Sequence, residues 1–488
     1  MSELGRLAPA TQTAPAASVR RWSAAFQFRF FLAVFLGFLW IAPAWWDRRI
    51  LYAMLAWDAV VIVAWIVDLR RLPSPREIMV SRRWAEPPSL DLDSQVELQV
   101  TNRSARGVSV SVEDEVPSTL AAKLPKFTLG LPGRGTTRAS FTVHPKVRGD
   151  IEVGKVFLRY SSPVRFAERW AVADLGLTVR VYPNLHEPRR YTLYLMRSRQ
   201  IEQEKRLKRL LGRGREFESL REYRESDEMR DISWTATARH GKLISRVYQV
   251  ERSQSVFLIV DAGRLMLART RPPAESRSNV GSERAEPEAA GADSPGTAPA
   301  PLTKLDYAVN AALTLAHVAM HSGDTTGLVA YGRKLQSFLP AARGGEHLRR
   351  LMEQLALVAG EPMEANHALA ADSLMGRQRR RSLVVWLTDL AETAATPEVI
   401  EAASRLLPQH LVLFAVVGEP ELRELIARRP DSPTRMYQYV AAQEIIQRRE
   451  ILLRRLREQG ALAMEFLPGK LSSEIVNRYL EIKSRGLL

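Results

Sequence analysis

The chain has 488 residues, of which 70 are lysine or arginine and 54 are aspartate or glutamate, so its formal net charge is +16. Hydrophobic residues make up 46% and charged residues 25%, a globular composition that excludes a wholly disordered chain and supports about three domains. The chain contains no cysteine, which excludes disulfides, thiolate metal sites and thiol nucleophiles. The excess of basic residues leaves nucleic acid and an anionic membrane surface as candidate partners, and the distribution of the charge must decide between them.

Two apolar segments lie close to the start of the chain. Residues 1–25 precede these segments and are rich in Ala, Pro and Thr, and we expect a disordered tail there. Residues 30–46 carry no charge, and residues 50–67 are interrupted only by Asp58. With flanking residues each segment spans roughly 27–30 Å as a helix, about the hydrocarbon thickness of a membrane, and tryptophans flank both. We therefore expect a two-helix transmembrane hairpin over residues 26–70, in which Asp58 faces the other helix, toward Arg29 or a backbone group; a buried hairpin of a soluble protein is the alternative.

The arginines around this hairpin predict its orientation. The short turn between the helices contains only two basic residues, Arg48 and Arg49. The outer flanks contain more: Arg20, Arg21, Arg70, Arg71, Arg76, Arg82 and Arg83. By the positive-inside rule, both termini and all that follows the hairpin face the cytoplasm.

Residues 77–185 change to short runs of alternating polar and apolar residues. The runs cover residues 96–102, 108–114, 138–144, 155–161 and 177–183, and turn residues separate them. Such spacing predicts an antiparallel β-sandwich-like module. No catalytic groups gather in it, so we interpret it as a spacer or binding module.

Residues 189–254 mix acidic and basic side chains at high density. This pattern favours a salt-bridged, folded element over a basic stripe for nucleic acid. A hydrolase would have to pair His240 with Ser245 and Asp227, and the sequence there has no G-x-S-x-G motif.

The same segment resembles the signature of the DUF58 family, bacterial proteins of largely undefined activity. The resemblance rests on an ordered set of matches around a Leu-Arg-Glu-Tyr at residues 220–223. Ser226, Met229 and Ser233 depart from the family's usual Gly, Pro and Asp. We expect an interaction motif made of Glu216, Phe217, Leu220, Arg221, Tyr223, Asp227, Arg230, Trp234 and Arg239.

The resemblance implies an architecture and a partner. Members of the family commonly carry an N-terminal membrane hairpin and a C-terminal von Willebrand factor A-like domain, and they usually accompany MoxR-type AAA+ ATPases. Together with the orientation that the arginines predict, it implies a location in the bacterial inner membrane with the soluble domains in the cytoplasm. It also implies the ATPase, the lipid bilayer and other membrane or envelope proteins as partners.

Residues 255–488 alternate apolar runs with helical stretches. The runs at residues 255–261, 326–332, 382–390, 411–417 and 462–468 predict a doubly wound parallel sheet, which fits an A-like α/β domain. Residues 271–301 are rich in Pro, Ala, Ser and Glu, and we expect a disordered insertion there.

Asp261 and Asp389 follow two of these strands, at the edge where open parallel sheets bind ligands. In the resembled A-like domain this edge holds a metal through Asp-x-Ser-x-Ser, a Thr and a second Asp. Here Gly263 and Leu265 replace both serines, Arg264 brings a cation, and the Thr position falls near Gly344 or Gly345. Because Mg²⁺ needs near-octahedral oxygen ligation, we interpret the two aspartates as a degenerate remnant and expect no cofactor.

The leading hypothesis is therefore a membrane-anchored, cytoplasm-facing interaction or adaptor protein of the DUF58 type. It is not an enzyme in this interpretation, and it works with a MoxR-type AAA+ ATPase in the assembly or chaperoning of envelope complexes. The chain has no P-loop motif, so ATP chemistry must come from the partner. The alternative is a metal-dependent hydrolase or Mg-dependent ligand-binding protein that uses the A-like domain. A nucleic-acid binder is disfavoured because no basic helix or finger is present.

Overall fold

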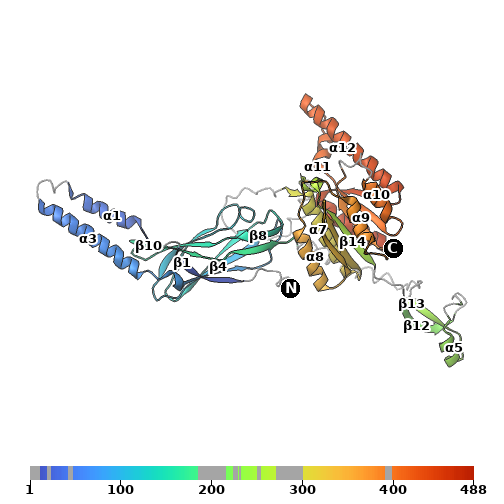
Figure 1. The fold of residues 1–488 in the computed structure, drawn as a ribbon, viewed down its shortest axis with the longest axis horizontal. Helices are drawn as coiled ribbons and strands as arrows, with labels where there is room; N and C mark the ends of the chain where they lie inside the picture. Colours follow the sequence, from blue (N-terminus) through green and yellow to red (C-terminus); the bar gives the residue numbers. More distant parts are fainter. Residues whose placement is uncertain are drawn as a thin grey trace, which may run out of the picture. The chain divides into compact units, whose positions relative to one another are not determined.

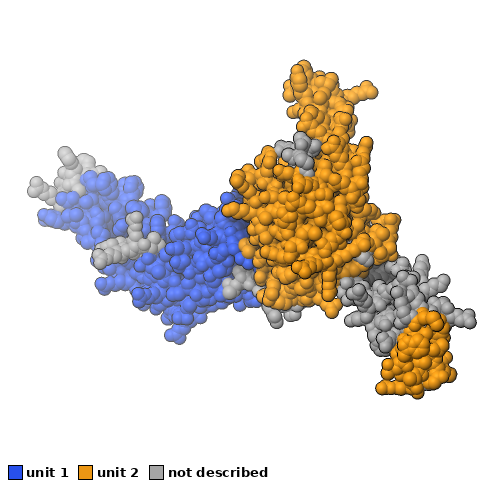
Figure 2. Space-filling view, turned by 45° about the vertical axis from the view of Figure 1, so that its right-hand side comes forward, with its two compact units in different colours: residues 1–184 blue, residues 185–488 orange. Residues whose placement is uncertain are grey.

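The structure is a computed structural model that describes residues 11–18, 24–41, 48–184, 216–223, 229, 232–249, 254–270, 301–390 and 398–487. The chain divides into two compact units, Met1–Asn184 and Leu185–Leu488, coloured separately in Figure 2. Both units combine helices with β-sheets, so the mixed, multidomain class predicted from the sequence is confirmed.

Two apolar helices, α1 (Phe28–Phe38) and α3 (Arg48–Arg71), pack side by side in the first unit (Figure 1). Helix α3 is long and apolar enough to cross a membrane, and only 6% of its most apolar window is buried. Helix α1 has 11 residues, which is short of a full span, and the expected turn at residues 42–47 lies outside the described residues. The described part of the chain thus contains one helix of spanning length beside a shorter apolar one.

A glycine lets these two helices approach closely. A Cβ atom added at Gly37 would lie 2.6 Å from Trp57 and 2.8 Å from the Oδ1 atom of Asp58, so any side chain there would clash. The indole Nε1 of Trp57 donates a hydrogen bond to the Ala33 carbonyl at 2.9 Å. Asp58 therefore faces α1, as its charge predicted, although its expected partner Arg29 instead donates to a backbone carbonyl 135 residues away.

A nine-stranded sheet forms most of the rest of this unit, in the order β6-β5-β9-β10-β1-β3-β4-β7 with β2 against β10. Neighbouring strands of this sheet pair antiparallel. Alternate residues of its strands are buried, which is why the alternation in the sequence predicted strands here. The strands are β1 (Gln12–Ser18), β2 (Ala24–Phe26), β3 (Ile78–Trp84), β4 (Ser94–Asn102), β5 (Val108–Asp114), β6 (Lys126–Leu131), β7 (Thr136–Val143), β9 (Val156–Ser161) and β10 (Ala167–Ala173). A separate antiparallel pair joins β8 (Gly149–Val153) to β11 (Leu177–Val181).

Within the predicted disordered tail of residues 1–25, strand β1 corrects the expectation for residues 12–18, whereas residues 1–10 and 19–23 lie outside the described residues. Residues 12–15 pair with β3 and residues 16–18 pair with β10, so β1 joins the two halves of the sheet. Ala16 is only 1% exposed between them. Composition misses this strand because its stability comes from partners 64 to 157 positions away along the chain.

A buried ion pair crosses the interior of the same sheet. The Arg82 guanidinium on β3 binds both carboxylate oxygens of Asp114 on β5, and both side chains are at most 1% exposed. Arg82 also donates to the carbonyls of Leu175 and Gly154, at 2.9 and 3.1 Å. All three guanidinium nitrogens are thus hydrogen-bonded, which allows the charge to remain buried.

The second unit contains a six-stranded sheet in the order β18-β17-β14-β19-β20-β21. Its strands are β14 (Ser255–Asp261), β17 (Thr325–Tyr331), β18 (Leu335–Ala342), β19 (Leu383–Thr388), β20 (Leu411–Val417) and β21 (Leu462–Phe466). All neighbours are parallel except β18, which returns antiparallel along β17. This edge strand was not predicted, because its residues are half-buried and show no alternation. Numbered within the sheet, the order is 3-2-1-4-5-6, which reverses between β14 and β19.

Helices line this sheet and complete its core. They are α7 (Lys304–His321), α8 (Gly345–Leu357), α9 (His367–Met375), α10 (Glu398–Leu406), α11 (Pro420–Ala427), α12 (Pro433–Glu458) and α13 (Leu471–Ser484). Side chains of α9, α10 and α12 share one buried cluster with alternate strand residues such as Phe257 and Trp386. Helix α7 contacts β14, β17 and β19 and packs on α13.

Two short strands close the base of the predicted insertion. Strand β15 (Arg269–Thr270) pairs with β16 (Leu302–Thr303), so the chain leaves and re-enters the fold at one place. Residues 271–300 lie outside the described residues, and the predicted disorder there stays a prediction.

Candidate functional site

The parallel sheet brings Asp261 and Asp389 to the same edge, where the carboxyl ends of β14 and β19 lie next to each other. The Thr388 hydroxyl, one residue before Asp389, donates to Asp261 Oδ2 at 2.6 Å. The backbone N–H of Gly263 donates to the other carboxylate oxygen of Asp261 at 2.7 Å. Both aspartates thus lie at the carboxyl ends of adjacent parallel strands, as the sequence predicted, and Asp261 is held there by Thr388 and Gly263.

Burial changes the acidity of Asp261. Its side chain lies in the interior, and removal from water raises its pKa from 3.8 to about 6, against the lowering effect of its two hydrogen bonds. The nearby carboxylate of Asp389 raises the pKa further. Asp261 is therefore an acid that titrates close to neutral pH, enclosed by its own loop.

A buried lysine supplies the cation next to Asp389. Lys304 is the first residue of α7, is completely buried, and forms ion pairs through Nζ with Asp389 and with Glu419, which follows β20. Asp389 is 1% exposed and Glu419 27%, so Glu419 is the member of this group nearest to solvent. A lysine at the first position of a helix, where the helix dipole disfavours a cation, was the signal available in the sequence.

A buried arginine from α12 completes the cluster. Arg449 is 2% exposed, and its guanidinium lies 2.6 Å from Glu465 on β21 and 3.3 Å from Asp389. It also lies 3.9 Å from Glu419. Sequence reasoning missed this arginine because it is one of many on a highly charged helix. We call the set Lys304, Asp389, Glu419, Arg449 and Glu465 the crevice cluster.

The geometry around Arg264 corrects the expectation that this residue places a cation in the crevice. Its side chain is 47% exposed, and Glu364 lies 4.0 Å away. The short turn that follows Gly263 directs Arg264 outward, and its backbone N–H donates to the Met363 carbonyl at 2.8 Å. Lys304, from a different element, provides the cation instead.

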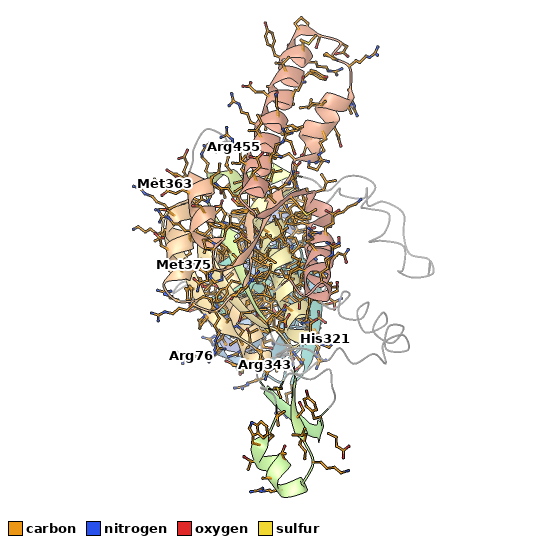
Figure 3. All side chains as sticks on the ribbon, turned by 90° about the vertical axis from the view of Figure 1, so that its right-hand side faces the viewer. Arg76, His321, Arg343, Met363, Met375 and Arg455 are labelled. Atoms are coloured by element: carbon orange, nitrogen blue, oxygen red, sulfur yellow. The ribbon has the colours of Figure 1, made fainter. Side chains whose placement is uncertain are left out.

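The loop that faces Asp261 is also different from the one expected. The Glu361 N–H donates to the Ala262 carbonyl at 2.7 Å, so residues 361–363 border the aspartate. Gly344 directly precedes α8 and follows the antiparallel strand β18. This strand ends beside the start of β17, at the amino ends of the parallel strands. Figure 3 shows this separation, with Met363 at one end of the sheet and Arg343 with His321 at the other.

The donor set does not fit a Mg²⁺ ion. Both carboxylate oxygens of Asp389 and both of Asp261 already have partners among the protein's own donors. Mg²⁺ prefers six oxygen ligands in an octahedron, and Lys304 brings a positive charge into direct contact with Asp389. Within the described ranges, no group of three or more His, Asp or Glu side chains is arranged to hold a metal ion.

A polar aromatic cluster lies under the same edge. The Trp386 indole N–H donates to the Tyr331 hydroxyl at 2.8 Å, and this hydroxyl lies 2.8 Å from His367 Nδ1. Burial lowers the pKa of His367 to about 4 and raises that of Tyr331 well above its usual value. Both side chains are therefore neutral at pH 7, and the cluster supports the strands that carry the aspartates.

The predicted interaction motif lies on a small separate element. Strands β12 (Glu216–Glu222) and β13 (Ile244–Gln249) pair antiparallel, and helix α5 (Trp234–His240) lies between them in the chain. Trp234 is 65% exposed, and Arg239 is also exposed. The Tyr223 N–H donates to the Leu243 carbonyl at 2.9 Å, which ties the end of β12 to the residue before β13.

The other members of the motif lie wholly or in part outside the described residues. Glu216, Phe217, Leu220 and Arg221 lie on β12, but their side chains lie outside the described part of the structure. Asp227 and Arg230 lie entirely outside the described residues, and so does the side chain of His240. The motif, and the weaker hydrolase hypothesis that pairs His240 with Asp227, therefore stay predictions.

A comparison with protein families finds a match that includes most of the predicted motif and much of the second unit. The family described as "Protein of unknown function DUF58" matches residues 219–277 and 289–427. No curated protein matches the chain.

Three solved structures show low similarity. The conserved hypothetical protein BatB from Bacteroides thetaiotaomicron is 12% identical, with a TM-score of 0.27 over 48% of this chain and 100% of that one. A β-glucosidase from Listeria innocua is 13% identical, with a TM-score of 0.13 over 22% and 16%. An uncharacterized membrane spanning protein from Vibrio fischeri is 14% identical, with a TM-score of 0.15 over 47% and 96%. Over residues 219–277 and 289–427, this chain is therefore similar to the DUF58 family.

Proposed function

We propose that the protein is a membrane-anchored, cytoplasm-facing interaction or adaptor protein, in which α1 and α3 form a transmembrane hairpin. The observation that carries this proposal is the pairing of β1 with β3. Strand β1 precedes α1 and strand β3 follows α3, yet Thr13 pairs with Ser81 and Ala14 with Val80 in one sheet. A chain that crosses a membrane between these strands has to cross it again, because both strands lie on the same side.

The surface of the two helices supports a lipid environment. Large apolar side chains are exposed on them, far more than a soluble protein leaves in contact with water. They include Phe28, Phe31, Leu32, Phe35, Leu36, Phe38, Leu51, Leu55, Val60, Ile62, Val63 and Ile66.

The end of α3 is fastened to the sheet. Asp68 accepts hydrogen bonds from the N–H groups of Phe166 and Ala167, at 3.1 and 2.9 Å, and from the Ser162 hydroxyl at 2.6 Å. The anchor and the sheet therefore move together, and two arginines, Arg70 and Arg71, close the helix beside them. By the positive-inside rule these arginines support a cytoplasmic location for the sheet.

In this proposal the first unit carries a β-sandwich and the second a von Willebrand factor A-like domain. The 3-2-1-4-5-6 strand order with an antiparallel third strand supports the latter. Because the crevice cluster has no free nucleophile and its carboxylates are engaged, we propose a role in binding rather than catalysis. The proposed partner is a MoxR-type AAA+ ATPase, acting on assemblies of membrane or envelope proteins at the bacterial inner membrane.

Cysteine labelling tests the anchor and its orientation. Because the natural chain has no cysteine, Asp47→Cys, between the two predicted membrane helices, and Lys123→Cys, in the loop between β5 and β6, each give a single label site. A membrane-impermeant maleimide is expected to label Asp47→Cys in intact cells and Lys123→Cys only after lysis. The reverse labelling, or recovery of the protein in the soluble fraction, would contradict the proposal.

Affinity capture tests the partner. The full chain in detergent, with mass spectrometry in ATP and in ADP, is expected to recover an AAA+ ATPase. The Trp234→Ala variant should lose it, because this exposed tryptophan lies in the matched family region. Trp170→Ala is the matched control, since Trp170 is 46% exposed on β10, outside that region. If no ATPase is captured in either nucleotide, the proposed partner is contradicted. If both variants capture the ATPase equally, the proposed role of the motif is contradicted.

A further inference from the structure

An A-like domain would hold a metal at the carboxyl ends of β14 and β19. In this chain a buried lysine, Lys304, places its ammonium group there. We propose that the Lys304 ammonium is the resident cation of the crevice cluster, so that this edge keeps its structure without any divalent metal. The inference concerns the second unit alone and does not depend on the membrane anchor or on the ATPase.

The position of Lys304 supports a permanent role. Its ammonium contacts Asp389 from β19 and Glu419 from β20, two adjacent parallel strands, and the lysine is completely buried. A buried ammonium persists only where carboxylates compensate for the water it has lost. Two such carboxylates meet it here, and its backbone N–H donates to the Ala268 carbonyl at 2.9 Å, which fixes the start of α7.

Basic side chains of the protein itself engage each carboxylate of the cluster. Glu465 binds Arg449 and also Arg423, at 2.6 and 2.8 Å. Three cations, Lys304, Arg423 and Arg449, therefore face three carboxylates, those of Asp389, Glu419 and Glu465. An added Mg²⁺ would have to displace the ammonium from oxygens that the ammonium already contacts.

The test uses hydrogen exchange of the full chain in detergent, read by mass spectrometry on peptides from β19 and β20. In the wild type, exchange is expected to be the same in millimolar Mg²⁺ and in EDTA, since a ligand of the folded state would slow it. Lys304→Met leaves Asp389 and Glu419 short of a cation, so exchange should accelerate on the order of 100-fold. Lys334→Met, at an exposed lysine of the same unit, is the control and should leave the rates unchanged.

A double variant separates charge balance from packing. Lys304→Met combined with Glu419→Gln removes one charge of each sign, and it is expected to recover on the order of 10-fold of the lost protection. If Lys304→Met does not fold, the comparison of Mg²⁺ with EDTA in the wild type still decides.

Three results would overturn the inference. One is slower exchange of the wild type in Mg²⁺ that Asp389→Asn abolishes, which would identify a metal site. Another is unchanged exchange in Lys304→Met. The third is a double variant that exchanges as fast as Lys304→Met, which would make the role of Lys304 one of packing.

Discussion

The buried carboxyl group of Asp261 makes the stability of the second unit depend on pH in a direction that can be tested. Burial raises its pKa to about 6 in the folded protein, against 3.8 as the ordinary value that we take for the unfolded chain. The folded state therefore binds the proton more tightly. The contribution of the Asp261 carboxyl to the stability of the folded state is therefore complete below pH 3.8, and it is lost as the pH rises through about 6.

The size of this effect follows from the two pKa values. The difference between 3.8 and about 6 corresponds to about 3 kcal/mol of unfolding free energy. Asp261→Asn keeps the side chain's size and its acceptor for the Gly263 N–H, and the Thr388 hydroxyl can turn to accept from the new amide. The variant should lose this part of the pH dependence and be up to about 3 kcal/mol more stable than the wild type at pH 7.

Oxidation of Met266 provides a local assay. This methionine is fully buried in the turn after Asp261, so peroxide reaches it only when the region unfolds. Urea titrations of Met266 oxidation, read by mass spectrometry between pH 4 and 7, give the unfolding free energy of both proteins. If the stability difference between wild type and Asp261→Asn does not change over this range, the raised pKa is wrong.

Three further predictions concern the first unit. Arg82→Met leaves Asp114 buried without a cation and should lower the free energy of unfolding by denaturant by about 3–5 kcal/mol. As the control, Arg180→Met removes the half-exposed Arg180–Asp150 pair and should lower it by less than about 1 kcal/mol. Equal losses in the two variants would contradict the prediction. Gly37→Leu should force α1 away from α3 and accelerate amide exchange in α1, and unchanged exchange would mean that the close approach is not required. Ala16→Asp places a charge between the two halves of the sheet and should expose residues 12–18 to protease; protection equal to wild type would contradict the pairing of β1.

Local patterns in the sequence predicted five of the nine strands described in residues 77–185 and five of the six strands of the parallel sheet. Alternation in residues 96–102 and 108–114 predicted β4 and β5, since one face of each strand is buried and successive side chains point to opposite faces. Continuous apolar runs predicted β14, β19 and β20, which are buried on both faces. The aspartates at the ends of β14 and β19 were likewise predicted to meet, because carboxyl ends of parallel strands share an edge.

Only the tertiary structure decided what surrounds those aspartates and what holds the start of the chain. Strand β1 is stabilised by β3 and β10, and nothing in the composition of residues 12–18 encodes such distant partners. Lys304 and Arg449 reach Asp389 from 85 and 60 positions away, and a sequence with 70 basic residues offers no local mark for the two that become buried. Charge pairing in an interior depends on distances of a few ångströms between elements, and those distances exist only after the chain has folded.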